Sequence, residues 1–429
     1  MPRPPQNATH LILLAGILAA LAGVGLWLQP AVINGDGVGY LKQLHGEGLS
    51  PGHLLYLPLI RALAGNPGTL LEAVPLLRGL SLASALAALL FVWDASRRVA
   101  GPGRALLAVA LLASSHAFMR SALEVEVYQV ATLACAVALW ALVRGASGGL
   151  AWASLAGAAA GVAAGFHSTL VLLGPALILA PRQRHWRRGA AAACLSAGSV
   201  LALILAWAAW VQGLSSVQDV WLWLRSADHG VPYPHGWRTA PATLWGLIRS
   251  LVHVPYPHQA PLWRVGLSTA LATAAWASLL LLCRGQGRGR LRLTLAWAAP
   301  LALFALAFYP SDTERWIFVL PALVLVLAPK PGRFATALVA AVALFNLASY
   351  QLPAHLDLQD PARAAAAEAL CQPGDVLISP GHGWEELVGL GSPHPPELFP
   401  LIHFVGALGG PGEAVVLMWR RIQEVHAAG

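Results

Sequence analysis

Long apolar runs separated by short polar loops dominate the order of residues along the chain. A helix needs about 20 mostly apolar residues to cross the hydrocarbon core of a bilayer. The first run is too long for the apolar region of a signal peptide, and no small-residue cleavage site follows it, so we expect a retained helix. The fifth and sixth runs are short and joined by a tight turn. The pattern predicts eleven membrane-spanning helices, near residues 10–33, 73–93, 104–119, 126–143, 149–166, 168–181, 189–211, 265–283, 292–309, 315–329 and 334–350.

Composition agrees with a membrane protein. Hydrophobic residues make up 57% of the 429 residues and charged residues only 11%, against about 25% charged residues in a soluble domain. The 17 tryptophans suit anchoring at the membrane interface. The net charge of +8 comes from arginines between apolar runs, so it does not indicate nucleic-acid binding. The cysteines lie far apart without disulfide or metal-ligand spacing, and we interpret all of them as structural: Cys135, Cys194, Cys283 and Cys371.

The distribution of charge predicts the orientation. One set of alternate loops holds 15 of the 27 basic residues and a single acidic residue, Asp94. The opposite set holds the other 12 basic and 18 acidic residues, over much longer loops. The positive-inside rule makes the first set cytoplasmic, with the N-terminus inside and the C-terminal region outside. The 15 basic residues are Arg3, Arg97, Arg98, Arg104, Arg144, Arg182, Arg184, Arg187, Arg188, Arg284, Arg288, Arg290, Arg292, Lys330 and Arg333.

The outer face is therefore expected to carry the long and acidic segments. Near the C-terminus, Gly374-Asp-Val-Leu-Ile-Ser-Pro-Gly381 predicts a strand that ends in a glycine turn, and a helix is expected to begin at Trp384. We predict an all-α polytopic membrane domain over residues 1–350 and a small extracytoplasmic α/β region over 351–429. The outer loops are expected at about 34–72, 120–126, 212–264 and 309–315.

Carboxylates close to the membrane surface are the first candidate site. Asp36 lies in Asn34-Gly-Asp-Gly-Val-Gly-Tyr40, just past the first run, where it is either ordinary turn chemistry or a general base on an acceptor hydroxyl. Glu124 and Glu126 lie at the outer start of the fourth run, either as solvated helix-end charge or as ligands for a metal or a substrate hydroxyl. Residues two apart do not share a helix face, so both would act together only if the helix starts between them. Glu126 with Tyr128 is the pair that we favour.

Two histidine segments are further candidates. His167 lies in Gly165-Phe-His-Ser-Thr169, at the outer turn of the tight helix pair, where it is either a structural cap or a phosphate-binding group, protonated or neutral. The long outer loop repeats a short motif, as Val231-Pro-Tyr-Pro-His-Gly-Trp-Arg238 and Val254-Pro-Tyr-Pro-His258. Such aromatic segments either anchor a loop at the interface or stack on sugars.

Arginines near these segments could meet phosphate. Arg238 ends the first copy of the repeat, Arg264 follows the second, and Arg315 lies in a compact outer turn. A guanidinium grips phosphate oxygens in a bidentate manner. For Arg315, pairing with Asp312 or with Glu314 is the equally weighted structural alternative.

These segments together resemble the GT-C class of membrane glycosyltransferases, and within it the protein O-mannosyltransferase-like family with a Pro-Gly-Tyr-Pro-Leu-Tyr signature. The matching segments are Asp36, Pro51-Gly-His-Leu-Leu-Tyr56, Glu126-Val-Tyr128, Gly165-Phe-His167 and Pro373-Gly-Asp-Val-Leu-Ile-Ser379. The likeness covers the first 180 residues best. The chain departs from the signature where Leu49 or Ser50 replaces a histidine and His53 replaces a tyrosine.

The resemblance implies an inverting glycosyltransferase that uses a polyprenyl-phosphate sugar on the outer leaflet. Asp36 would then remove the acceptor proton, and Glu126 would orient the acceptor or a divalent cation. No cofactor is certain. The acceptor is a protein, lipid or glycan hydroxyl. The residues expected to bind substrate are Glu124, Tyr128, His167, His53, Arg238, Arg264 and Arg315.

Two other functions stay open. A transporter or flippase of lipid-linked substrate would place ionisable residues near the bilayer midplane. The sequence puts no acidic residue in the middle of a predicted span and shows no clear repeat of halves. A non-catalytic protein with the same fold is the other alternative. The enzyme hypothesis requires Asp36, Glu126 and His167 to converge on one outer cavity.

Overall fold

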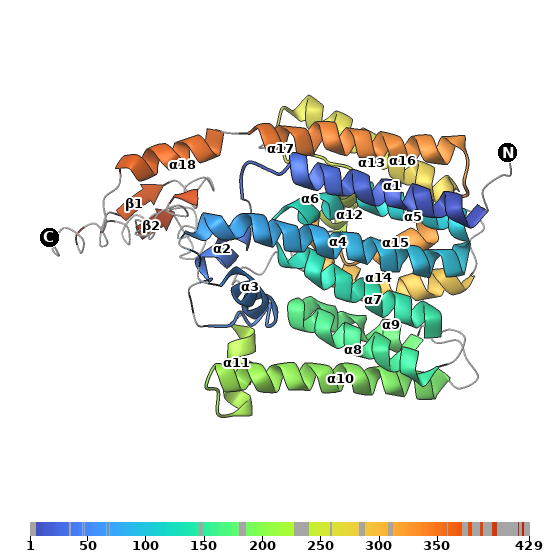
Figure 1. The fold of residues 1–429 in the computed structure, drawn as a ribbon, viewed down its shortest axis with the longest axis horizontal. Helices are drawn as coiled ribbons and strands as arrows, with labels where there is room; N and C mark the ends of the chain where they lie inside the picture. The colour runs from blue at the N-terminus through green and yellow to red at the C-terminus, as the bar shows by residue number, and fades with distance from the viewer. Residues whose placement is uncertain are drawn as a thin grey trace.

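The computed structural model places the chain as a bundle of long helices with short helices and a small strand pair at one end (Figure 1). The residues it describes are 6–33, 36–44, 46, 48–65, 67, 69–145, 149–179, 186–226, 240–257, 260–282, 288–307, 312–357, 359–370, 376–379, 387–388, 397–400, 419 and 423.

The first half of the bundle contains α1 (Gln6–Trp27), α2 (Asp36–Lys42), α3 (Tyr56–Ala64), α4 (Leu70–Ala100), α5 (Pro102–Ser114), α6 (His116–Leu123), α7 (Val127–Gly145), α8 (Leu150–Phe166), the 3₁₀ helix η1 (Ser168–Leu173) and α9 (Gly174–Leu179). The second half contains α10 (Trp186–Val211), α11 (Val217–Arg225), α12 (Ala240–Leu251), α13 (Leu262–Leu282), α14 (Arg288–Ala307), the 3₁₀ turn η3 (Glu314–Trp316), α15 (Leu320–Leu327), α16 (Arg333–Asn346), the π-helical turn η4 (Leu347–Gln351) and α17 (Leu352–Leu356). The C-terminal region adds α18 (Gln359–Leu370), β1 (Val376–Ser379) and β2 (Glu397–Pro400).

Each of the eleven predicted runs coincides with helix in the described residues, so the polytopic all-α fold is confirmed. Within the described residues, six helices are long and apolar enough to cross a membrane, or seven if α5 and α6 form one span bent by 61°. Three further apolar helices are shorter: α8, η1 with α9, and the described part of α14. The run predicted at 315–329 is also short, because α15 has only 8 residues. Six or seven of the eleven predicted spans are therefore long enough to cross a membrane, and the assignment of the shorter runs as spans stays a prediction.

Small residues and local breaks set this packing. Gly101, at a φ of 86°, ends α4, and Pro102 starts α5 at once, because proline suits the first position of a helix. The break between α5 and α6 frees backbone carbonyls, and the amide of Asn346 donates to the Ser114 carbonyl at 2.7 Å. A Cβ placed on Gly161 of α8 would lie 2.8 Å from the Ala197 carbonyl of α10, so these helices approach closely.

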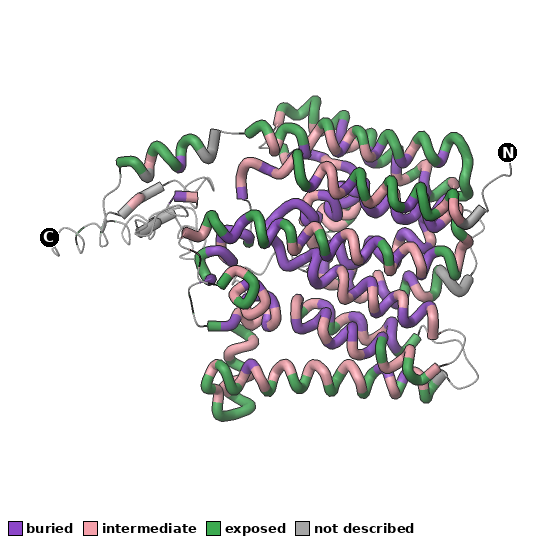
Figure 2. The backbone as a smooth tube through the Cα atoms, in the orientation of Figure 1, coloured by how far each residue is buried: buried purple, intermediate pink, exposed green. Residues whose placement is uncertain are grey.

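Burial separates the inner helices from the outer ones. Figure 2 shows buried residues concentrated in the centre of the bundle, where α4, α5 and α7 lie, whereas α1 and α10 expose much of their length. Large apolar side chains such as Leu13, Leu203 and Trp210 are exposed on these outer helices. Exposed leucines on long helices suit contact with lipid.

The predicted outer segments meet at one end of the bundle. The helices α2, α3 and α11 and the strand pair lie there, and the basic end of α4, with Arg97 and Arg98, lies at the other end (Figure 1). Which of the two ends faces the cytoplasm stays a prediction from charge.

The predicted tail strand is present as β1, which pairs in parallel with β2. The helix expected at Trp384 and most of residues 401–429 lie outside the described residues. The assignment of 351–429 as a separate α/β region therefore stays a prediction.

Candidate active site

The turn from Glu124 to Glu126 is the centre of the candidate site. It joins α6 to α7, and the amide of Gln129 fixes it by donating to the Phe118 carbonyl at 2.9 Å and the Ser121 hydroxyl at 2.8 Å. Both glutamates are buried, so their interpretation as solvated helix-end charge is wrong. The helix does not start between them, which was the condition for the two to act together, because α7 begins after both, at Val127. In this extended backbone the two side chains meet different surroundings.

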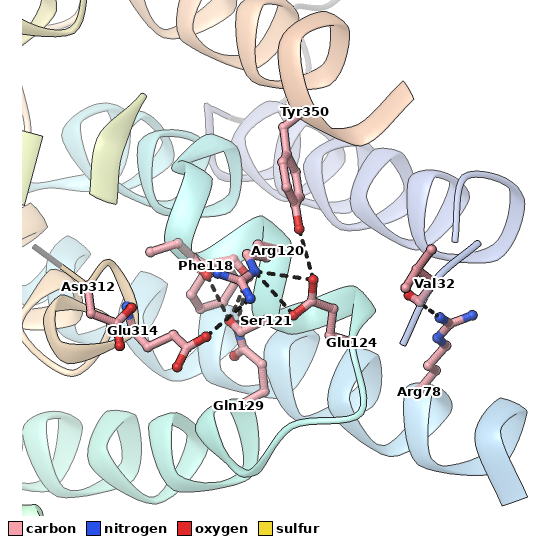
Figure 3. A network of polar contacts seen from close by, with 11 residues as sticks. Val32, Arg78, Phe118, Arg120, Ser121, Glu124, Gln129, Asp312, Glu314 and Tyr350 are labelled. Atoms are coloured by element: carbon pink, nitrogen blue, oxygen red, sulfur yellow. Dashed lines mark hydrogen bonds and ion pairs between the residues drawn. The ribbon is translucent and has the colours of Figure 1, made fainter. Parts of the chain in front are cut away.

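Glu124 belongs to a buried polar network that also contains Arg120, Glu314 and Tyr350, called here the Glu124 network (Figure 3). Arg120 Nε donates to both oxygens of Glu124, at 3.2 Å each, and a terminal nitrogen of Arg120 lies 3.2 Å from Glu314 Oε1. The Tyr350 hydroxyl donates to Glu124 Oε1 at 2.8 Å. Glu124, which was expected to bind substrate, is thus held by protein groups.

Glu126 has no such partners among the described residues. Both of its carboxyl oxygens are buried without a hydrogen bond, and so are the hydroxyls of Tyr40 and Tyr56. Burial raises the pKa of Glu126 well above its usual value, and the charges of Glu314, Asp36 and Glu124 raise it further. The raised pKa favours the protonated carboxyl group, and this form can donate a hydrogen bond.

Asp36 is the exposed first residue of α2, and α2 packs directly on the Glu124–Glu126 turn. A Cβ on Gly37 would lie 2.6 Å from the Val125 carbonyl oxygen, so only glycine allows this approach. The Asp36 charge acts on Tyr40, Glu126 and Arg315. The structure therefore brings Asp36 and Glu126 to one place. We call Asp36, Glu126, Tyr40 and Tyr56 the carboxylate site.

The two histidine segments are joined beside this site. Leu55 N donates to Gly165 O and Ser168 N donates to Gly52 O, both at 3.0 Å. The His53 ring adds a third link, with Nδ1 donating to the Phe166 carbonyl at 3.1 Å. A carbonyl can only accept, so Nδ1 of His53 carries a proton.

His167 is buried in an aromatic cluster. Its ring centroid lies 5.0 Å from that of His53, 5.4 Å from Tyr128 and 5.0 Å from Phe318. Burial lowers the pKa of His167 well below its usual value, and the charges of His53 and Arg315 lower it further. Of its two predicted forms the neutral one is favoured, so His167 offers a hydrogen bond rather than a positive charge.

Arg315 supplies positive charge near the carboxylate site. Its Nε lies 3.8 Å from Asp312 Oδ2, which agrees with the predicted pairing to Asp312. Burial, followed by the charge of Glu314, raises the pKa of Asp312 to about 7. A carboxyl group that is half protonated near neutral pH balances only part of the Arg315 charge.

The two other predicted arginines are not placed at this site. Arg238 lies outside the described residues, as does the whole first copy of the repeated motif. Arg264 is exposed and lines a different pocket with His253. In the second copy of the motif, Tyr256 packs on Trp245 and on the guanidinium of Arg249, which suits an anchored loop.

Comparison with known proteins identifies the fold and a partial family match. Residues 60–210 match the model of the family described as dolichyl-phosphate-mannose-protein mannosyltransferase. The fold is similar to that of ArnT from Cupriavidus metallidurans in the apo state, with 12% identity and a TM-score of 0.61 over 92% of this chain and 86% of that one. The chain has the GT-C fold. The resemblance inferred from the sequence is thus confirmed at the level of fold and family likeness.

Other GT-C structures agree. ArnT bound to undecaprenyl phosphate is 14% identical, with a TM-score of 0.59 over 94% of this chain and 88% of that one. The oligosaccharyltransferase of Archaeoglobus fulgidus tethered with an acceptor peptide is 13% identical, with a TM-score of 0.50 over 92% of this chain and 64% of that one. No curated protein sequence matches the chain.

Sequence reasoning missed Tyr40 and Tyr56 of the carboxylate site and the three partners in the Glu124 network, Arg120, Glu314 and Tyr350. Glu314 was considered only as a possible partner of Arg315. Arg120 offered a signal, since it stands alone among apolar residues and lies four positions before Glu124. Tyr350 offered none, because it lies 226 positions from its partner.

A metal site is the remaining prediction to place. The described residues contain no group of three or more His, Cys, Asp or Glu side chains that could hold a metal ion. A divalent cation at the carboxylate site would rest on Asp36, and on Glu126 only if this carboxyl group released its proton, with the remaining oxygen ligands coming from substrate or water.

Proposed function

We propose that the chain is an inverting glycosyltransferase, which moves a sugar from a polyprenyl-phosphate donor to an acceptor hydroxyl on the extracytoplasmic side. The main support is the packing of α2 on the Glu124–Glu126 turn, which sets the exposed Asp36 beside the buried Glu126. ArnT, which shares the fold, has been solved bound to undecaprenyl phosphate, and the family matched by residues 60–210 is described as using dolichyl-phosphate mannose.

The acceptor is activated by Asp36 in this proposal. Asp36 is accessible, as a group that must meet an incoming hydroxyl should be. Its carboxylate takes the hydroxyl proton while the acceptor oxygen forms a bond to the anomeric carbon. The bond from that carbon to the phosphate oxygen breaks, and its electron pair leaves with the polyprenyl phosphate. Attack opposite the leaving group inverts the anomeric centre. General-base assistance of this kind contributes about 10²–10⁴-fold to rate.

The other groups bind and orient. Arg315 neutralises the negative charge of the donor phosphate, because the charge of Asp312 is only partly developed near neutral pH. Neutral His167 lies near Arg315 and offers a hydrogen bond to the same phosphate. Glu126, protonated and unpaired, donates to a substrate oxygen beside Tyr40 and Tyr56. No step in this mechanism is assigned to a metal ion.

The two alternatives fit these groups less well. In a transporter, we would expect the key carboxyl groups on broken helices near the middle of the bundle. Here they lie in a turn at the end where α2 and α3 pack. A non-catalytic protein would have no need for a carboxyl group kept buried without partners. His53, which replaces the tyrosine of the family signature, is compatible with the site, because its side chain joins the two histidine segments.

The test compares Asp36→Asn with Asp219→Asn in purified protein inserted into nanodiscs. Asp36 is exposed and Asp219 is partly exposed, and each is an acid in the first turn of a short helix at the same end of the bundle. Consumption of a radiolabelled polyprenyl-phosphate sugar is measured. Asp36→Asn should lower turnover by about 10²–10⁴-fold, and Asp219→Asn should leave it unchanged. Turnover by Asp36→Asn at the wild-type rate removes Asp36 from the mechanism.

A further inference from the structure

A second pocket lies at the same end of the bundle, between the segment that follows α1, the segment joining α12 to α13, and the η4–α17 turn. Its volume is about 320 Å³, which is near the lower limit for small-molecule sites and suits one sugar-sized unit. The lining residues are Val32, His253, Pro255, Ala260, Arg264, Ser349, Tyr350, Pro353, Ala354 and Asp357. They differ from those of the carboxylate site.

The walls of this pocket are fixed by hydrogen bonds between distant parts of the chain. Ala31 N donates to Ala354 O at 3.0 Å, and His355 Nδ1 donates to Gln29 O at 2.8 Å, so α17 is tied to the end of α1. His253 N donates to Asn346 Oδ1 at 2.7 Å. The pocket is therefore a built feature and not a gap between loosely placed loops.

The polar lining can bind hydroxyl groups. Nδ1 of His253 and the Ser349 hydroxyl are both buried without a hydrogen-bond partner. Burial lowers the pKa of His253 to about 4, with further lowering from the charges of Arg249, Arg264 and Arg120. The imidazole is thus neutral at pH 7. The ring also bonds the Ser349 backbone, which leaves Nδ1 as an acceptor for a ligand hydroxyl.

The pocket also favours a negative group. Three arginine charges act on His253, and one of these arginines, Arg264, lines the pocket itself. Asp357 is the single acidic side chain in the lining. The ring of Tyr350 and the apolar faces of Pro255 and Pro353 complete walls of the kind on which a sugar ring packs.

One residue connects the pocket to the catalytic centre. Tyr350 lines the pocket, and its hydroxyl donates to Glu124 Oε1 at 2.8 Å (Figure 3). Glu124 is two positions from Glu126, and Val125 between them contacts Gly37 beside Asp36. The pocket and the carboxylate site therefore lie on two sides of one turn.

We propose that this pocket binds the acceptor through a hydroxyl-bearing headgroup whose anionic substituent faces Arg264. The inference rests on the proposed function. The donor phosphate has its own cation in Arg315, beside Asp36. A substrate bound across the Glu124–Glu126 turn from the donor can present a hydroxyl to the carboxylate site.

The test measures binding of mannose 6-phosphate to the full chain in phosphatidylcholine nanodiscs, by saturation-transfer NMR. Mannose lacks the anion and inorganic phosphate lacks the ring, so both should bind more weakly. Arg264→Gln should weaken binding roughly fivefold, the size expected for one partly exposed charge. Ser349→Leu should abolish it by filling the pocket. Arg225→Gln, an exposed arginine on α11, is the matched control and should bind as wild type does.

The outcomes separate this inference from the proposed function. Asp36→Asn should stop donor turnover and still bind mannose 6-phosphate. Wild-type turnover in Asp36→Asn would contradict the mechanism and leave the pocket in place. Absence of binding by the wild type, or unchanged binding in both Arg264→Gln and Ser349→Leu, overturns the pocket assignment. Binding lost in Asp36→Asn would also overturn it, by placing the ligand at the carboxylate site.

A competition arm identifies the source of the headgroup. Phosphatidylinositol carries a hydroxylated ring and a phosphate on a lipid, and it is added to the nanodiscs. Competition with mannose 6-phosphate that is lost in Arg264→Gln assigns a lipid-borne headgroup. Binding without competition assigns a soluble one. Competition that persists in Arg264→Gln contradicts the shared site.

Discussion

Two buried or half-buried acids at opposite ends of the bundle differ in how they are satisfied. Asp94 accepts hydrogen bonds from Arg97 Nε at 2.6 Å, Arg98 Nε at 2.8 Å and Trp140 Nε1 at 2.8 Å, and Arg144 lies 3.3 Å away. Glu126 is fully buried, and neither of its carboxyl oxygens has a partner among the described residues. The hydrogen bonds of Asp94 account for its position as a structural feature. No hydrogen bond among the described residues accounts in the same way for the burial of Glu126.

The difference agrees with the proposal that the end of the bundle holding Glu126 binds substrate. A buried polar group without a hydrogen bond lowers the stability of the fold by about 1–3 kcal/mol. The hydroxyls of Tyr40 and Tyr56, like the carboxyl group of Glu126, are buried without a hydrogen bond. Such a cost is retained where the groups serve a substrate. Asp94, in contrast, holds the end of α4 to α7 and has no bonding capacity left to offer.

Apart from Asp36→Asn itself, the largest effect is expected from Gly37→Ala. A methyl group there would lie 2.6 Å from the Val125 carbonyl oxygen, so α2 must move away from the turn and carry Asp36 with it. A displacement of about 1 Å at a reacting group costs about 10²-fold in rate. We expect donor turnover to fall by about that factor while the helical circular dichroism of the purified protein is kept.

Gly39→Ala is the control for this substitution. Gly39 lies in the same short helix, and a Cβ there would meet no atom within 4 Å. Alanine is also the better helix former. Wild-type turnover in Gly39→Ala with loss in Gly37→Ala assigns the effect to the contact with Val125. Equal turnover in both variants would contradict the close approach of α2 to the turn.

The second prediction concerns separate substitutions of the two acids, Glu126 and Asp94. Glu126→Leu should lower donor turnover by about 10–100-fold, the value of one strong hydrogen bond to substrate, and should not lower thermal stability, because the carboxyl group that it removes is buried without a hydrogen bond. Asp94→Asn should do the reverse, with wild-type turnover and a loss of about 1–2 kcal/mol from weakened bonds to its arginines. Turnover and melting temperature are measured on both. Equal effects of both substitutions would show that the presence of hydrogen-bond partners does not distinguish a structural acid from a functional one.

Some of the fold and of the candidate site could be predicted from the sequence. Apolar length placed each helix, and the motif segments at Asp36, Glu126 and His167 do lie at one end of the bundle. The spacing of Glu124 and Glu126 indicated that they face different surroundings. It did not indicate which of them is held by the protein, because the partner of Glu124 comes from Tyr350, 226 positions away.

The other features of the fold and the site could not be predicted, because they depend on packing contacts that leave no periodic pattern in the sequence. The burial of Glu126, the fit of Gly37 against Val125 and the link from His53 to Phe166 are contacts between segments far apart in sequence. Lengths of broken helices were missed for the same reason. An apolar run shows that a segment can enter the membrane, whereas Asn346 and its carbonyl partners decide where α5 and α6 break.

The smallest effect concerns pH and the acid beside Arg315. The pKa of Asp312 is raised from 3.8 to about 7, first by burial and then by the charge of Glu314. A carboxyl group whose pKa is higher in the folded state stabilises the fold below its unfolded pKa, and this contribution is lost as pH rises through about 7. The melting temperature of the wild type should therefore fall between pH 5 and pH 8, and the fall should be smaller in Asp312→Asn, by roughly 1–3 kcal/mol in unfolding free energy. Asp219→Asn should keep the wild-type slope, because hydrogen bonds from Ser216 and Ser215 lower the pKa of this partly exposed acid and it does not titrate between pH 5 and pH 8. An unchanged slope in Asp312→Asn would mean that Asp312 is ionised throughout, so that it fully balances Arg315 and the donor phosphate must find its cation elsewhere.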